Sequence, residues 1–218
     1  MKKRGMTAFL VMEAALFACI LTSGGVMLAV ACFASILLCG FYGWAGASKS
    51  TTLLCIGLLC TVCADFCLVV CTPMQQLWGM VFFLGAQTMY AFYLSRGKKK
   101  HFWWVRLSLS FCALALTVAV LREKTDALAL VSVCYYANLI LNLVQAMLRK
   151  DGMLATAFVF FLLCDTIIGL QAASGVYLTI EPGTALYRIL FCGFNLAWFF
   201  YLPSQVLIAL RTAGGWKK

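Results

Sequence analysis

Charged residues are scarce in this chain, and their scarcity sets the class of protein. Of the 218 residues, 11% are charged and 64% are hydrophobic, and the mean hydropathy is +0.98. A soluble domain is normally about half apolar and about a quarter charged. The composition therefore excludes a soluble globular domain. It predicts an all-α protein, a polytopic bundle of transmembrane helices.

Histidine is nearly absent, and this narrows the possible chemistry. His101 is the single histidine, whereas the twelve cysteines lie almost entirely within apolar runs. Catalytic zinc usually needs two or three nitrogen or oxygen ligands around an open position, more than one histidine supplies. Buried cysteine behaves as a small hydrophobic residue, so we interpret these cysteines as packing groups. We expect no disulfide, no metal and no other cofactor.

Eight apolar runs are long enough to cross a bilayer core about 30 Å thick, which needs about twenty residues per helix. They cover residues 6–22, 26–46, 51–71, 75–95, 102–121, 127–148, 153–174 and 184–210. Short connections with turn residues, such as Ser23-Gly24-Gly25, separate the runs. The sequence predicts a single integral membrane domain over residues 1–218. We expect its first two runs to form a helical hairpin, rather than a leader that is cleaved from the mature chain.

Basic residues are distributed unequally between the two sides of the predicted bundle. Thirteen of the 17 fall on one side if the N-terminus is cytoplasmic. They are Lys2, Lys3, Arg4, Lys49, Arg96, Lys98, Lys99, Lys100, Arg149, Lys150, Arg211, Lys217 and Lys218. The positive-inside rule then places both termini in the cytoplasm, in a cell membrane such as a bacterial inner membrane. The net charge of +10 is thus a topology signal, and we expect no nucleic-acid partner.

Two aspartates, Asp65 and Asp165, lie deep inside apolar runs. An ionised carboxylate in hydrocarbon costs several kcal/mol, so such residues usually have a functional role. Lys49 precedes Asp65 by 16 residues and Lys150 precedes Asp165 by 15. At ~1.5 Å per helical residue, both carboxyls lie roughly 22–24 Å from a basic anchor. Their equal depth predicts one shared site.

The two halves of the chain resemble each other at an offset of 108 residues. At that offset Phe83, Gly85, Phe92, Tyr93 and Leu94 coincide with Phe191, Gly193, Phe200, Tyr201 and Leu202, and Gln87 meets Asn195. Four helices per half would make a parallel 4+4 repeat about an axis along the membrane normal, with the site at the repeat interface. Chance similarity between apolar helices is the alternative. The repeat predicts that Asp65 and Asp165 face each other.

The order of short motifs over residues 49–210 resembles the YhhN-like lysoplasmalogenase family. The motifs are Lys49-Ser-Thr-Thr-Leu-Leu, Asp65, the GAQTMYAFY stretch, Cys164-Asp165 and Tyr201-Leu-Pro-Ser-Gln205. Three departures are present. Ser50 replaces the family's proline, Ala64 and Cys164 replace the small partners of the acids, and Gln87 stands where the family usually has histidine. The resemblance implies an eight-helix membrane enzyme.

The resemblance also implies a reaction, hydrolysis of the vinyl-ether bond of lysoplasmalogens to a fatty aldehyde and a glycerophospho-head group. The partner would be a lysophospholipid or another lipid in the membrane. Vinyl ethers hydrolyse by protonation at carbon, which suits a pair of carboxyl groups of which one keeps its proton. We expect Asp65 and Asp165 to be that catalytic pair. The candidate substrate-binding residues are Lys49, Gln87, Tyr90, Asn138, Asn195, Tyr201 and Gln205.

Other interpretations of the same residues stay open. In a small-solute or proton-coupled carrier, the two acids would bind protons or a cation at mid-membrane. In a non-catalytic lipid-binding relative, Gln87 would mark the loss of activity. A single Asn or Gln also serves as an interhelical hydrogen bond worth about 0.6 kcal/mol, and Lys49 serves equally well as a topology anchor.

Overall fold

The computed structural model describes residues 3–97, 101–176 and 178–214, and in these ranges it contains helices and no sheet. The helices are α1 (Lys3–Thr22), α2 (Gly25–Gly46), α3 (Thr52–Asp65), η1 (Phe66–Val70), α4 (Gln76–Leu94), α5 (His101–Leu121), η2 (Arg122–Lys124), α6 (Ala127–Leu148), α7 (Gly152–Ala173), α8 (Ala185–Leu190) and α9 (Leu196–Thr212). The predicted all-α bundle is confirmed.

Among the described residues, seven helical segments are long and apolar enough to cross a membrane. They are Arg4–Thr22, Gly25–Gly46, Thr52–Val70, Gln76–Leu94, Trp103–Lys124, Ala127–Leu148 and Gly152–Ala173. These segments correspond to the first seven runs predicted from the sequence. The chain is therefore a multi-pass membrane protein.

The eighth run, residues 184–210, is not one continuous helix as predicted. It is divided into the short α8 and the 17-residue α9, with an irregular stretch over residues 191–195 between them. Thr184 Oγ1 accepts a hydrogen bond from Tyr187 N at 3.2 Å and starts α8, and Asn195 Oδ1 accepts from Trp198 N at 3.4 Å and starts α9. Side chains of this kind satisfy the first backbone N–H groups of a helix. Each caps a separate helix start within the apolar run.

The third span changes its helical geometry at the first aspartate. The α-helical part of the span ends at Asp65, and a π-helical turn over Phe66–Val70 completes it. The N–H of Cys71 donates to the carbonyl of Phe66 at 3.0 Å, the five-residue spacing of a π turn. Single π turns within helices are frequent at functional sites. Asp65 therefore occupies a junction in the backbone rather than a regular helical position.

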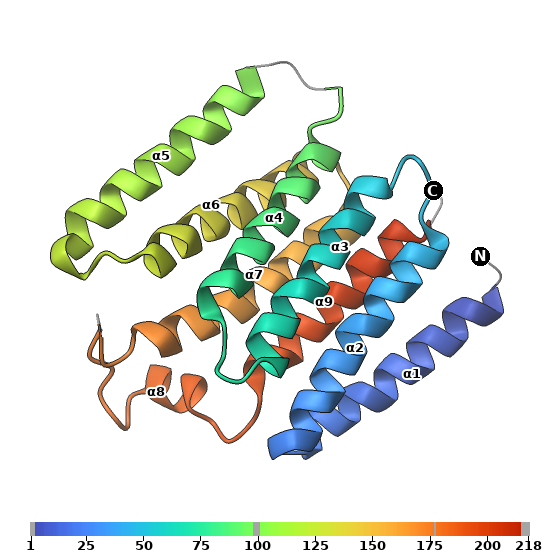
Figure 1. Cartoon of the computed structure of the whole chain (residues 1–218), viewed down its shortest axis with the longest axis horizontal. Coiled ribbons are helices and arrows are strands. Elements are labelled where there is room, and N and C mark those ends of the chain that lie inside the picture. The colour runs from blue at the N-terminus through green and yellow to red at the C-terminus, as the bar shows by residue number, and fades with distance from the viewer. Residues whose placement is uncertain (1–2, 98–100, 177, 215–218) are drawn as a thin grey trace.

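Five helices, α3, α4, α6, α7 and α9, form the centre of the bundle, and α1, α2 and α5 lie at its edges (Figure 1). The most extensive packing joins α7 to α9, α3 to α4 and α4 to α6. Most of the buried side chains form one cluster, which spans α3, α4, α6, α7 and α9 and reaches the edge helices α1 and α2. The central helices therefore place both aspartates inside the protein rather than against lipid.

Helices α3 and α4 approach closely because Gly57 has no side chain. An ideal Cβ at this glycine would lie 2.2 Å from Cε1 of Tyr90, whose side chain is 0% exposed. Contacts this short are not tolerated, and the buried ring lacks free space into which to move. Gly57 is therefore a packing residue between the two helices.

Gly57→Ala should destabilise the protein by about 1–3 kcal/mol, the usual cost of overpacking a core. Thermal unfolding in detergent measures the change. Gly85→Ala is the matched control, because its Cβ would meet Cys60 Sγ at an ordinary 3.8 Å. We expect the control to melt at or slightly above the wild-type temperature. Equal melting temperatures of the two variants would contradict the close approach of α3 and α4 at Gly57.

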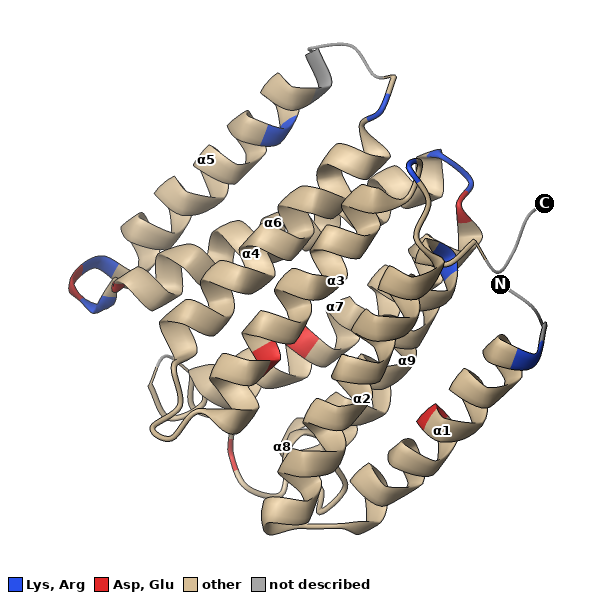
Figure 2. Cartoon of the chain, turned by 45° about the vertical axis from the view of Figure 1, so that its right-hand side comes forward, with Lys and Arg blue, Asp and Glu red and all other residues tan. Residues whose placement is uncertain are grey.

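Several Lys and Arg residues lie at the end of the bundle that holds both termini, and a smaller group lies in the connection between α5 and α6 (Figure 2). At the end with the termini, Arg96 Nη1 donates to the Ser50 carbonyl, Arg149 Nη2 donates to the Arg96 carbonyl at 2.5 Å, and Arg211 pairs with Asp151 at 2.9 Å. These contacts join the ends of α4, α6 and α9 to the loops after α2 and α6. Lys2, Lys98, Lys99, Lys100, Lys217 and Lys218, which also carried the topology prediction, lie outside the described residues.

We expect this basic end to face the cytoplasm, by the positive-inside rule. Two native lysines test the orientation without any substitution. Lys49 is exposed in the loop between α2 and α3, at the basic end, and Lys124 is exposed in η2 between α5 and α6, a connection at the opposite end of the bundle in Figure 1. A membrane-impermeant amine reagent applied to sealed cells should modify Lys124 and spare Lys49, as read by peptide mass spectrometry. Permeabilised cells should show both modified, and modification of Lys49 in sealed cells would reverse the orientation.

Candidate functional site

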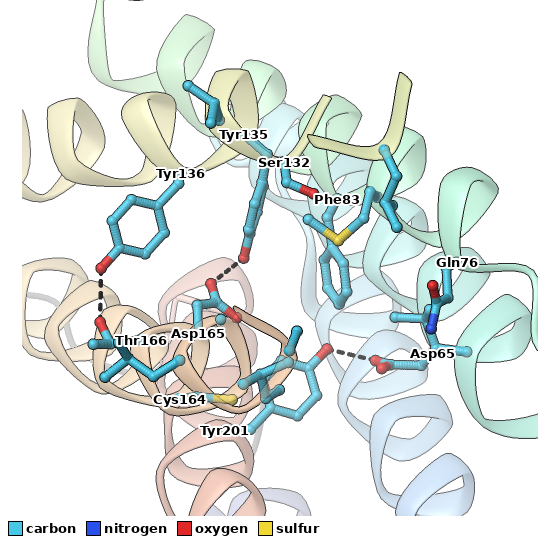
Figure 3. A pocket seen from close by; sticks show the side chains of 18 of the residues that line it. Asp65, Gln76, Phe83, Ser132, Tyr135, Tyr136, Cys164, Asp165, Thr166 and Tyr201 are labelled. Carbon is cyan, nitrogen blue, oxygen red and sulfur yellow. Dashed lines mark hydrogen bonds between the residues drawn. The ribbon is translucent and has the colours of Figure 1, made fainter. Parts of the chain in front are cut away.

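A cavity of about 850 Å³ lies within the bundle, lined by residues from α3, η1, α4, α5, α6, α7 and α9 (Figure 3). Its wall is mostly apolar and includes Leu68, Met80, Phe83, Ile168 and Trp198. The volume falls in the range of about 300–1,000 Å³ that is usual for small-molecule sites. The cavity is the candidate ligand site of this protein.

Asp165 lines this cavity from α7 and is held by a tyrosine of α6. Its Oδ2 accepts a hydrogen bond from the hydroxyl of Tyr135, whose side chain is 3% exposed. One residue further along both helices, the hydroxyls of Tyr136 and Thr166 lie 2.7 Å apart. Two consecutive polar pairs therefore join α6 to α7 and fix the orientation of the Asp165 carboxyl.

Asp65 lines the same cavity from the end of α3 and is held by α9. Its Oδ2 accepts a hydrogen bond from the Tyr201 hydroxyl at 2.5 Å, and its side chain is 3% exposed. The Tyr201 ring makes edge-on contacts with Trp198, at a centroid distance of 5.0 Å, and with Phe161, at 5.4 Å. Aromatic contacts of this geometry add to burial in holding a ring in place.

The two carboxyls thus share one cavity, and each has its own tyrosine donor (Figure 3). Within the described part of the chain, no hydrogen bond joins the two carboxyls directly, and no side chain hydrogen bonds either Oδ1. Each carboxyl therefore keeps one oxygen atom that no described side chain binds. Nor do the described residues include a group of three or more His, Cys, Asp or Glu side chains placed to hold a metal ion.

Among the other residues predicted from the sequence, Tyr201 is the one that the structure brings to this cavity. Gln87 and Asn138 belong to a separate buried network at the α4–α5–α6 contact. Gln87 Oε1 accepts from Asn142 at 2.8 Å, and Arg106 donates to Asn138 at 3.0 Å and to Asn142 at 2.6 Å. These hydrogen bonds lie away from the cavity wall, and the buried Nε2 of Gln87 has no hydrogen-bond partner among the described residues.

The remaining predicted residues also lie outside the cavity wall. Tyr90 is buried against Gly57, and Asn195 caps α9. Gln205 donates to Ser204 Oγ at 3.1 Å, and Lys49 is exposed in the loop at the basic end. The structure therefore does not place any of these groups next to the aspartates.

Sequence reasoning missed Tyr135, the hydrogen-bond donor to Asp165, and the neighbouring pair of Tyr136 and Thr166. A signal for them was present, because two adjacent tyrosines stand in the middle of the apolar run 127–148. They precede Asp165 and Thr166 by thirty residues each. Two antiparallel helices with a short connection bring such positions to the same depth.

Comparison with known families gives one result for most of the chain. A profile described as the YhhN family matches residues 26–212, a stretch that contains both aspartates and both tyrosine donors. No curated protein and no solved structure matches the chain.

Proposed function

The chain belongs to the YhhN family, which includes lysoplasmalogenases, and on this premise we propose that it is an intramembrane hydrolase of vinyl-ether lipids. It would cleave the 1-alkenyl ether bond of a lysoplasmalogen to a fatty aldehyde and the glycerophospho-head group. The observation that carries the proposal is the pair of carboxyls, Asp65 and Asp165, each held by a tyrosine at one largely apolar cavity.

The reaction needs an acid and a base close to the same bond. A carboxylic acid first transfers its proton to the outer carbon of the C=C–O group, which leaves an oxocarbenium ion. A carboxylate then takes a proton from water as the water oxygen bonds to the cationic carbon, giving a hemiacetal. The hemiacetal loses its hydroxyl proton, its C–O bond to glycerol breaks, and the glycerol oxygen gains a proton. Overall, one lipid molecule and one water molecule give one aldehyde and one alcohol.

The two aspartates fit these two roles. Glycosidases make an oxocarbenium-like transition state with a similar pair, one protonated and one ionised. In our proposal one aspartate keeps its proton, because a low-dielectric cavity disfavours two ionised carboxyls. Asp165 is half-buried whereas Asp65 is nearly covered, so in our proposal Asp165 is the group that first meets the lipid.

The tyrosines would keep both carboxyls in place through the reaction. The Tyr135 and Tyr201 hydroxyls each bind an Oδ2, which leaves the Oδ1 atoms for the proton transfers to lipid and water. Locked orientation of this kind is a large part of catalysis by paired groups. The apolar wall, with Leu68 and Met80, would receive the hydrocarbon chain.

Gln87 does not weaken the proposal. It stands where the resembling family usually has histidine, yet its side chain is fully buried in the network with Asn142. It is not part of the cavity wall that holds the aspartates. Its amide therefore replaces a group at an interhelical contact rather than one that would touch the vinyl ether.

The experiment that tests the proposal is aldehyde release by the purified protein. A 1-alkenyl lysophospholipid should yield fatty aldehyde, detected by mass spectrometry after derivatisation. The matched 1-alkyl lipid should yield none, because it lacks the double bond that accepts the proton. Absence of aldehyde from both lipids would contradict the proposal, and proton-coupled uptake by reconstituted vesicles would then favour a carrier.

A further inference from the structure

The two aspartates lie nearer to one end of the bundle than to the other. α3 and α7 both start at the basic end, and Asp65 and Asp165 each follow the first residue of their helix by thirteen residues. Eight residues of α7 follow Asp165, and the third span ends five residues after Asp65, at Val70. At 1.5 Å per residue, each acid lies about 20 Å from the basic end, and Asp165 lies about 12 Å from the opposite end. Both carboxyls therefore belong to the half of the bundle opposite the basic end.

The cavity extends from the aspartates towards this opposite end. Its wall includes Met74 in the connection before α4, Gln76 at the first residue of α4, and Ala172 one residue before the end of α7. All three residues are exposed, and we call them the rim of the cavity. Towards the basic end, in contrast, the wall includes no residue of α3 before Asp65 and none of α7 before Cys164. A ligand therefore reaches the aspartates from the opposite end.

The length of a lysophospholipid head fits the short distance to this end. Five single bonds of about 1.5 Å join the vinyl-ether oxygen to phosphorus, which therefore lies within roughly 6 Å of that oxygen. With the ether at Asp165, a head group directed to the opposite end of α7 brings phosphorus within about 6 Å of that end. A head group directed to the basic end would leave phosphorus about 14 Å short of it. There the ionised phosphate would lie in the hydrocarbon region, where a charge is costly.

The polarity of the wall agrees with a head group at the rim. Among the described residues that line the cavity there is no Lys, Arg or His, so the interior offers no cation to hold a buried phosphate. A phosphate at the rim needs none, because water reaches it there. The exposed amide of Gln76 is a hydrogen-bond donor at this position. The vinyl ether can thus lie at the aspartates while the charged group stays at the membrane surface.

We infer that the cavity takes its lysophospholipid from the leaflet at the end of the bundle opposite the basic end, with the head group at the rim. The inference rests on the proposed function, which places the vinyl ether at the two aspartates. It goes further by naming the pool of lipid that the protein uses. With the basic end in the cytoplasm, that pool is the outer leaflet, and the protein acts on it without moving the lipid across the membrane.

Turnover in sealed vesicles of known orientation tests the inference. The full-length protein with a C-terminal affinity tag is reconstituted at no more than one copy per vesicle, and a resin for the tag separates the vesicles. Retained vesicles have the basic end outward, because the chain ends there after α9. A 1-alkenyl lysophospholipid is added outside. Aldehyde is measured before the lipid crosses the bilayer, which is checked by extracting the lipid with albumin.

We expect the initial rate per protein to be at least about tenfold higher in the vesicles that are not retained, because an ionised head group crosses hydrocarbon poorly. Detergent should make the two rates equal. Equal rates in sealed vesicles, or a higher rate in the retained vesicles, overturn the inference. In that case aldehyde release in detergent still supports the proposed function.

A non-hydrolysable probe tests the inference separately from catalysis. A 1-alkyl lysophospholipid with a photoactivatable head group is bound to the full-length protein in detergent, and the crosslinked peptides are identified by mass spectrometry. We expect crosslinks in residues 71–76 and at the end of α7. Crosslinks confined to the loops that contain Lys49 and Lys150 overturn the inference. Crosslinks at the rim without any aldehyde release in detergent reject only the proposed function.

Two adjacent variants show whether these crosslinks depend on the rim. Gln76→Trp places a large side chain at the rim and should remove most of the crosslinking. Gln75→Trp is the matched control, because Gln75 is also exposed but is not part of the cavity wall, and its crosslinking should match wild type. Equal crosslinking of the two variants overturns the inference. Their melting temperatures are compared to confirm that both fold.

Discussion

Asp65→Asn and Asp165→Asn should each lower the rate of aldehyde release by at least ~10²-fold, the usual scale for losing a general acid or base. Asparagine keeps the shape of the side chain and its contact with Tyr201 or Tyr135, but it neither gives nor takes the reacting proton. It also replaces a group that is costly to ionise in a membrane, so folding should be retained. Initial rates and thermal unfolding of the same preparations measure both effects.

Glu13→Gln is the matched control for these two variants. Glu13 is also a buried intramembrane carboxyl, at 4% exposure, and it is held by Ser35 at 2.6 Å and Cys39 at 3.2 Å. It lies between α1 and α2 and is not part of the cavity wall. We expect its activity to stay within about twofold of wild type, as for a surface or packing position away from the site. Wild-type rates from both aspartate variants would remove the acids from the mechanism.

Gly169→Phe should lower the rate by at least about tenfold, because it fills the cavity beside Asp165 and misplaces the lipid. Gly169 lines the cavity on α7, and an added Cβ would meet no atom within 4 Å, so the ring has room to enter. The loss should appear in catalysis or binding while the melting temperature stays near that of wild type.

Gly193→Phe is the control for this variant. Gly193 also has no atom within 4 Å of an added Cβ, but it lies in the irregular stretch before α9 and outside the cavity wall. Its rate should match wild type. If Gly169→Phe keeps full activity and binding, the lipid does not occupy this cavity.

The sequence was sufficient to predict the membrane class, seven of the spans and the two aspartates that line one cavity. These features follow from local composition, because an apolar run of about twenty residues has few alternatives to a membrane helix. The division of the last run could not be predicted in the same way. Thr184 and Asn195 act as caps there, and a capping role depends on the path of the backbone as much as on residue type.

The sequence shows which polar side chains lie inside the spans, but their hydrogen-bond partners were harder to predict. From the sequence, Gln87 and Asn138 were predicted to be site residues at intermediate depth. In the structure, Gln87 accepts a hydrogen bond from Asn142, and Asn138 accepts one from Arg106. Depth along a helix follows from counting residues, whereas the direction of a side chain depends on which helices pack together. Tyr201 reached the cavity because α9 packs on both α3 and α7.

The internal repeat stays a prediction. The pairs α3–α4 and α7–α9 pack extensively, as two related halves would. The tyrosine contacts do not follow the same pattern, because Tyr201 binds Asp65 while Asp165 is bound by Tyr135. Tyr93, which aligns with Tyr201, lies instead beneath Arg96 and Arg211 at the basic end.

The central claim is protonation of a vinyl ether at carbon by the aspartate pair, and hydrolysis in D₂O tests it most directly. The carboxyl protons exchange with solvent, so the proton delivered to the lipid becomes a deuteron. We predict that the aldehyde, trapped at once by reduction to its alcohol, carries one deuterium on the carbon next to the former carbonyl. Aldehyde formed without deuterium at that carbon, or no aldehyde at all, would contradict the account.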